Sequence, residues 1–180
     1  MAHDMNKIAL SVVLILSAAG FISPLSAKQD GRVSFQGAVV SATCAVAAES
    51  QDQVIYMGQV RSNQLLSPGS WLNITPFHII LNDCSDSTGE QVAVMFNGAT
   101  DANDPQLFSI AAGTDSAKGI GIGIFDFKDE IVIPGSRPVR YATLQSGQTV
   151  LAFSAKYGVT DTQIIAGDAS TQVLFNLFYP

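Results

Sequence analysis

Short runs in which apolar residues alternate with polar or small residues recur along most of the chain. Most runs are about five to nine residues long, rich in β-branched and aromatic side chains, and separated by Gly, Asn, Asp, Pro or Ser. No long segment has the apolar spacing of a helix. The runs that predict strands are 32–36 continuing into 38–40, 53–57, 77–81, 91–96, 119–127, 149–157 and 171–179.

The first part of the chain has a different pattern. Lys7 precedes a continuous run of apolar and small residues from Ile8 to Ile22, and small residues lead up to Ala27. A positive start, an apolar centre and a small-residue exit are typical of a secretory signal peptide. The run is shorter than the roughly 20 residues that span a bilayer as a helix. We expect residues 1–27 to be removed, with cleavage after Ala19 and an uncleaved anchor as alternatives.

The charge balance excludes some classes of partner. The net charge is −6, and no cluster of Lys and Arg interrupts the acidic character. An acidic chain without a basic patch argues against nucleic acid and anionic lipid as partners. The hydrophobic content of 47% is too high for a disordered chain. The remaining residues therefore predict one folded domain with a real core.

Two cysteines, Cys44 and Cys84, lie outside the expected signal peptide. In an exported protein a single pair indicates a structural disulfide. A metal or redox pair is the alternative, but the spacing is too wide for CxxC chemistry and His78 is the only histidine left. Several short strands with one cross-link predict an all-β sandwich of Greek-key type.

The last predicted strand is unusual for a closed sandwich. Val173, Phe175, Leu177 and Tyr179 occupy every second position, and only Pro180 follows. No later strand would cover the edge of this one, and an open apolar edge invites pairing with another chain. The alternative is that these residues belong to the core of a complete sandwich.

The segment after the expected cleavage site offers a matching strand. Gly31, Val33, Phe35, Gly37 and Val39 again occupy every second position. A chain with a vacancy at one end and a spare strand at the other can polymerise head to tail into a filament that does not close. Strand addition would supply main-chain hydrogen bonds, and alternate side chains would fill pockets.

The order and spacing of several motifs around the two cysteines resemble one protein family. The chain is similar to pilin subunits of the chaperone–usher class, type 1 fimbriae in particular, over essentially all of its length after the signal peptide. The segments that carry this resemblance are Gly31–Cys44, Ile80–Cys84, Val92–Gly98, Gly119–Phe125, Phe153–Tyr157 and Phe175–Pro180.

The resemblance implies an immunoglobulin-like Greek-key sandwich that lacks its last strand and is completed by a donor strand from another chain. It implies export through the periplasm to a fimbrium on the bacterial cell surface. A periplasmic pilus chaperone would lend the missing strand, and an outer-membrane usher would organise its exchange for the extension of a neighbouring pilin subunit. By the same resemblance, residues 28–37 form the donor extension and residues 38–180 the pilin domain.

The resemblance also assigns site residues. Gly31, Val33, Phe35 and Gly37 would form the donor strand, with Val33 and Phe35 filling pockets. The carboxylate after Pro180 would contact the chaperone, although members of the family commonly end in a polar residue and proline removes one backbone donor. The acceptor groove would be lined by the strand near Val39 to Thr43 and by Val173, Phe175, Leu177 and Tyr179.

No other motif predicts chemistry as specifically. There is no GxSxG elbow, HExxH helix or phosphate-binding loop, so we expect no enzyme, cofactor or metal. Trp71 could stack against a sugar, although packing explains a lone aromatic better. Asp101, Asp104, Asp115 and Asp126 fit solvated loops better than a calcium cage. A tip, adaptor or terminating subunit and a monomeric periplasmic binding protein remain alternative functions.

Overall fold

The computed structural model describes residues 33–36, 44–64, 67–85 and 89–180. The chain divides into two compact units, Met1–Val39 and Val40–Pro180, which are described separately. In the first unit, residues 33–36 have no regular secondary structure and their side chains are exposed. No helix in the described part of the chain is long and apolar enough to cross a membrane.

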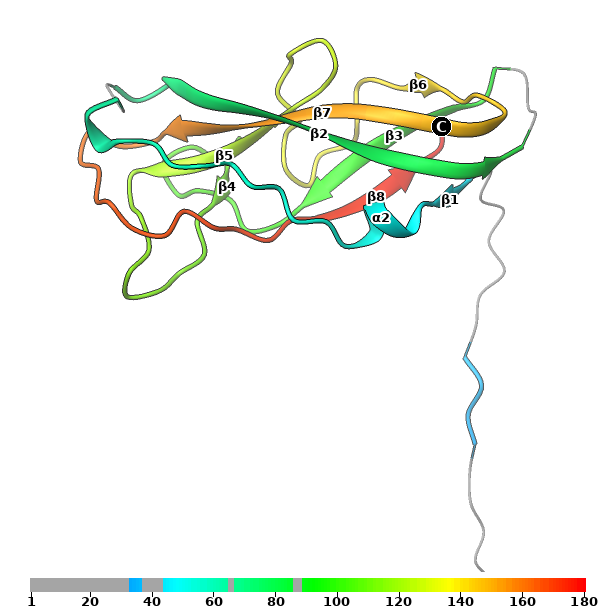
Figure 1. Cartoon of the computed structure of the whole chain (residues 1–180), viewed down its shortest axis with the longest axis horizontal. Coiled ribbons are helices and arrows are strands. Elements are labelled where there is room, and N and C mark those ends of the chain that lie inside the picture. The colour runs from blue at the N-terminus through cyan, green and yellow to red at the C-terminus, as the bar shows by residue number, and fades with distance from the viewer. Residues whose placement is uncertain (1–32, 37–43, 65–66, 86–88) are drawn as a thin grey trace, which may run out of the picture. The chain divides into compact units, whose positions relative to one another are not determined.

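The second unit is built from two antiparallel sheets (Figure 1). One sheet has the strand order β1-β2-β7-β5-β4, and the other has the order β6-β3-β8. The elements are β1 (Ala45–Val46), α2 (Ala48–Gln51), η1 (Ser62–Gln64), β2 (Trp71–Cys84), β3 (Gln91–Asn97), β4 (Phe108–Ser109), β5 (Ile120–Phe125), β6 (Ala142–Thr143), β7 (Gly147–Val159) and β8 (Leu174–Phe178).

The longest ladder joins β2 to β7, and β5 pairs with the other edge of β7. In β5, isoleucine alternates with glycine, so all isoleucines point to the same face of the sheet. These strands, together with β3 and β8, confirm the strands predicted at 77–81, 91–96, 119–127, 149–157 and 171–179. The all-β sandwich is confirmed as well.

Other predicted strands differ from the structure. Residues 53–57 were predicted as a strand, but they pair with no described strand, and residues 33–36 are also irregular. Residues 38–40 lie outside the described residues. The sequence did not predict β4 and β6, since a strand of two residues is too short to show alternation.

The core lies between the two sheets. The rings of Phe77, Phe96, Phe153 and Phe175 meet there, with centroids 5.1–6.5 Å apart for the pairs that contact. The buried residues of the main cluster come from both sheets: Cys44, Ile79, Leu81, Cys84, Val92, Val94, Phe96, Phe108, Ile124, Leu144 and Leu151. Aromatic residues of this size supply a large share of the apolar area that stabilises such a sandwich.

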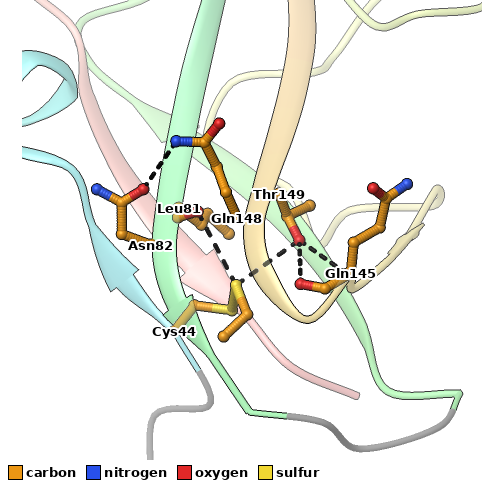
Figure 2. Close-up of a disulfide and its surroundings, with 7 residues drawn as sticks. Cys44, Leu81, Asn82, Gln145, Gln148 and Thr149 are labelled. Atoms are coloured by element: carbon orange, nitrogen blue, oxygen red, sulfur yellow. Dashed lines mark hydrogen bonds between the residues drawn. A yellow bond between two sulfur atoms is a disulfide. The ribbon is translucent and has the colours of Figure 1, made fainter.

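The predicted disulfide is confirmed between Cys44 and Cys84 (Figure 2). It lies beside the two residue pairs that join β1 to β2. The Thr149 hydroxyl lies 3.6 Å from the Cys84 sulfur and accepts a hydrogen bond from the backbone N–H of Gln145. The bridge therefore fixes the start of the described domain to the end of β2.

Candidate functional site

The strand β8 is paired along only one of its edges. Its five residues pair with β3, from Leu174 opposite Asn97 to Phe178 opposite Ala93. No described strand pairs with the other edge, since β8 ends the order of its sheet. An unpaired edge presents a row of backbone N–H and C=O groups to which another strand can bind.

Across from β8 lies the segment 52–60, which follows α2. Gln53, Ile55 and Met57 are half-buried, whereas the intervening Val54 and Tyr56 are 70% and 86% exposed. This is the alternation of a β-strand, yet no backbone–backbone hydrogen bond joins this segment to another described segment.

Side chains hold this segment in place instead. The Gln53 side chain donates to the carbonyl of His78 at 3.1 Å, and the Asn73 side chain donates to the carbonyl of Met57. These contacts position the segment, and apart from the Met57 carbonyl they leave its backbone N–H and C=O groups available to another strand. His78 itself is exposed on β2, as its position in an alternating strand predicts.

A groove of about 1040 Å³ separates this segment from β8 and the residues before it. Figure 1 shows the cyan segment after α2 and the orange-to-red segment before β8 along the same side of the sheet. The floor is apolar and consists of side chains from both sheets: Phe77, Ile79, Phe96, Ile120, Ile122, Ile124, Ala155, Tyr157, Val173 and Phe175. Such a floor can bind alternate apolar side chains of an added strand.

Few charged groups line this groove, although uncharged polar side chains lie along both of its sides. Asp52 and Asp168 are the charged residues that line it in the described part of the chain. Tyr157 is buried at its floor, and this burial, together with the Asp168 carboxylate, raises the pKa of the Tyr157 phenol. With a neutral tyrosine and two surface carboxylates, the groove is suited to binding a peptide segment.

The structure brings together part of the residue set predicted for the acceptor groove. Val173 and Phe175 line the groove. Leu177 and Tyr179 share the inner face of this end of the chain and pack against the core beyond the groove. The Tyr179 hydroxyl is buried without a hydrogen-bond partner among the described residues, and Pro180 is exposed.

Other predicted residues lie elsewhere. Val39, Gly31 and Gly37 lie outside the described residues. Val33 and Phe35 belong to the first unit, where they are 77% and 94% exposed. The assignment of these residues to a donor strand therefore stays a prediction.

The sequence did not assign segment 52–60 to the groove, although this segment forms one side of it in the described residues. The predicted strand near Val39 to Thr43 lies outside the described residues, so its place in the groove stays a prediction. The run Gln53–Met57 is visible in the sequence and predicts a strand, but it does not indicate that this strand borders a groove.

Two groups of residues that the sequence analysis considered as sites and judged better explained otherwise can be placed in the structure. Trp71 begins β2 and packs edge-to-face on Phe125, with the ring centroids 4.8 Å apart. Among the described residues, no group of three or more His, Cys, Asp or Glu side chains is placed to hold a metal ion. The Asp126 carboxylate instead accepts hydrogen bonds from the backbone of Lys128 and Glu130 in a tight turn.

Comparisons with known proteins point in one direction. A family model described as fimbrial protein matches residues 33–180. The chain is 34% identical to a putative fimbrin-like protein, FimI, of Salmonella typhi, over 97% of this chain and 99% of that one. It is 35% identical to the long polar fimbria protein A of Salmonella typhimurium, over 95% of this chain and 94% of that one.

Solved structures give the same picture for the fold. A chain from a chaperone–usher pilus matches with a TM-score of 0.64 and 25% identity, over 88% of this chain and all of that one. The P pilus rod subunit PapA matches with a TM-score of 0.59 and 21% identity, over 77% of this chain and all of that one.

Proposed function

Because the chain belongs to the fimbrial protein family, we propose that its groove receives the N-terminal segment of a neighbouring subunit during fibre assembly. The fold is the incomplete immunoglobulin-like sandwich of pilin subunits, as predicted. The chain is a structural subunit of a fimbria that is exported through the periplasm to the bacterial cell surface. It acts by assembling with other chains, and we propose no catalytic role for it.

The observation that carries the proposal is the pair of unpaired strand edges along one apolar groove. On one side β8 lacks a second neighbour among the described strands, and on the other side residues 52–57 alternate like a strand without a ladder. An inserted strand could satisfy the backbone groups of both sides at once.

The donor strand that we propose is the segment 28–37, and the receiving domain is 38–180. In an extended donor, Gly31, Val33, Phe35 and Gly37 share one face. Val33 and Phe35 would bury their side chains against the floor, and the glycines fit where the floor leaves no room for a side chain. This choice is supported by the alternation and by the exposure of Val33 and Phe35 in the unit that contains them.

The partners follow from the same arrangement. Neighbouring pilin subunits supply donor strands in the finished fibre, which can be a homopolymer or a heteropolymer. Before assembly, a periplasmic pilus chaperone would occupy the groove, with its contacts on Val173, Phe175, Leu177, Tyr179 and Pro180. An outer-membrane usher would direct the exchange of the two strands.

A peptide in trans tests the proposal. The mature chain is refolded with and without a synthetic peptide of residues 28–40, and thermal unfolding is measured. We expect the peptide to raise the melting temperature by about 10–20 °C, since it buries two large side chains. A peptide with Val33→Ser and Phe35→Ser is the matched control and should have little effect. A high melting temperature that neither peptide changes, also after removal of residues 28–37, would show that the sandwich is complete.

A further inference from the structure

The groove has a rim as well as a floor, and the rim has its own chemistry. We propose that this rim recognises the outward face of the donor strand: Arg32 of one chain packs on Tyr56 of the next, in the field of the two rim carboxylates Asp52 and Asp168. The inference rests on the proposed function, because it requires the donor to lie in the groove. It adds a specificity determinant that is independent of the pocket-filling residues.

Both sides of the groove alternate between inward and outward side chains. From 52 to 57, the odd-numbered residues are half-buried and the even-numbered residues are exposed. From 168 to 176 the same rule holds, with Ala169, Thr171, Val173 and Phe175 half-buried and the residues between them exposed. The exposed set on the two sides forms the rim: Asp52, Val54, Tyr56, Asp168, Ser170, Gln172 and Leu174.

Tyr56 is the largest exposed side chain of this rim. Its side chain is 86% exposed, and its neighbour Val54 is 70% exposed. A large aromatic ring at the edge of an unfilled groove can cover a neighbouring strand once that strand is present. Tyrosine combines a broad apolar face with the negative quadrupole that attracts a guanidinium.

The charge of the rim is entirely acidic in the described residues. Asp52 and Asp168 line the groove, and no described lysine or arginine does. The Asp168 carboxylate accepts a hydrogen bond from the Ser170 hydroxyl, which leaves other lone pairs for a cation. A cationic donor would be drawn to this groove more strongly than an acidic or neutral one.

The proposed donor segment has the complementary charge. Residues 28–37 contain Lys28 and Arg32 against one acid, Asp30. In an extended strand these three residues share the face opposite Val33 and Phe35. When Val33 and Phe35 point into the groove, Lys28 and Arg32 therefore point outward, at the level of the rim.

Arg32 is the better placed of the two bases. It directly precedes Val33, so it lies within the part of the donor that enters the groove, whereas Lys28 begins the segment. Its planar guanidinium can stack on a tyrosine ring and pair with a carboxylate at the same time, which an ammonium group does less well. One exposed cation–π contact with one exposed ion pair corresponds to about a tenfold gain in affinity.

A double-mutant cycle tests this contact. The receiving chain is the full mature protein with Val33→Ser and Phe35→Ser in its own segment, so that the segment competes poorly for the groove. Fluorescently labelled peptides of residues 28–40 are titrated into this chain, and binding is read by anisotropy. We expect the Arg32→Ala peptide to bind about tenfold more weakly than the unchanged peptide, and the Ser34→Ala control to bind equally well.

The receiving chain is then varied. Tyr56→Ser should weaken the unchanged peptide by several-fold and should remove most of the difference between the unchanged and Arg32→Ala peptides. Asp52→Asn combined with Asp168→Asn should flatten the salt dependence of binding. Ile74→Ser is the matched control, because Ile74 is also exposed but does not line the groove.

The outcomes distinguish failure of the contact between Arg32 and Tyr56 from failure of strand donation itself. Equal affinities for the unchanged and Arg32→Ala peptides would overturn the rim contact and leave strand donation intact. A difference that persists fully in Tyr56→Ser would likewise overturn the assignment to Tyr56. If the unchanged peptide binds no better than the Val33→Ser, Phe35→Ser peptide, strand donation and the rim contact fall together.

Discussion

Two openings lead from the surface of the sandwich to the same apolar core. One lies between β3 and β7 and is covered by the segment 126–142, which leaves a pocket of about 300 Å³. The other is the groove between segment 52–60 and β8, with about 1040 Å³. A segment of the same chain thus narrows the first opening to a small pocket, whereas no described strand fills the second.

Ion pairs and a β-bridge hold segment 126–142 over the first opening. The Arg140 guanidinium pairs with the Asp126 carboxylate at 3.0 Å and with Glu130. Phe125 also bridges back to Ile131, so the turn between them is pinned to the sheet. The difference between the two openings is that the first has a segment of its own chain across it, whereas the second runs beside the unpaired edge of β8 and has room for one more strand.

The largest effect is expected from closing the open groove in cis. A flexible linker and a second copy of residues 28–40 are added after Pro180. We expect a melting temperature about 10–20 °C higher, because burial of a valine and a phenylalanine contributes about 3–6 kcal/mol. Differential scanning calorimetry measures the change. A fused copy with serine at the two pocket-filling positions should melt like the unextended chain, and equal melting of both fusions would contradict the vacancy.

Removal of the disulfide that fixes β1 to the end of β2 should have the next largest effect on stability. Cys84→Ser opens a cross-link between residues 40 positions apart, which the chain-entropy model values at about 4 kcal/mol. We expect denaturant unfolding to show a loss of this size and chaperone capture to fail, because β1 is no longer fixed to β2. Cys44→Ser with Cys84→Ser should behave the same, and a normal fibre yield from Cys84→Ser would count against the prediction.

A smaller loss of stability is expected from a substitution in β5, on the face of the five-stranded sheet that is turned away from the groove. A Cβ at Gly123 would lie 2.6 Å from the Trp71 ring, so Gly123→Ala should cost about 1–3 kcal/mol by overpacking. Thermal melts measure the loss, and Trp71→Leu in the same chain should recover part of it. Peptide binding should not change, because Gly123 faces away from the groove. Weaker peptide binding at full stability would show that the two faces are coupled.

The smallest effect on stability is expected from the ion pair between Arg140 and Glu130 in segment 126–142. The hydrogen bond from Arg140 lowers the pKa of the Glu130 carboxyl below its usual 4.5. The contribution of the Arg140–Glu130 ion pair to the stability of the fold is therefore present above pH 4.5. It is lost as the pH falls through the lowered pKa of Glu130. We expect Arg140→Gln to lose less stability than the unchanged chain between pH 6 and pH 3, as measured by thermal melts.

Arg137→Gln is the control for this prediction. Arg137 stacks on the Phe178 ring at 4.9 Å, and none of its described contacts is a carboxylate. Its substitution should leave the pH dependence unchanged. Parallel pH profiles for Arg140→Gln and the unchanged chain would show that the ion pair does not support the cover.

The sequence predicted the longer strands well where the partner strand lies in the same chain, but not the two-residue strands β4 and β6. β3, β5 and β7 combine clear alternation with neighbours in the chain, and their predicted positions agree with the structure. The predicted run for β2 began at Phe77, directly after Pro76, which cannot donate to a ladder. In the structure β2 begins at Trp71, and the described β1 pairs only with its far end, so Pro76 has an edge position.

The groove could be predicted only in part. The alternation from Val173 to Tyr179 is a local property of the sequence. It indicated which residues in and around β8 face inward, toward the groove and the core. Segment 52–57 has the same property, but alternation does not say whether the partner belongs to the same chain. The placement of Asp52 and Asp168 along the same groove depends on how two segments distant in the sequence fold, which no spacing in the sequence encodes.

Because β8 and segment 52–60 both run along the groove, their direction has a mechanical consequence. A strand seated between β8 and segment 52–60 would be held by hydrogen bonds along its length, and tension on a fibre would pull along that same direction. Such a load is shared among all the bonds at once, so none can be broken alone, whereas a load across the strand would open them one after another. The joint between subunits would then resist traction without a covalent link, while a strand peeled from one end could still be replaced.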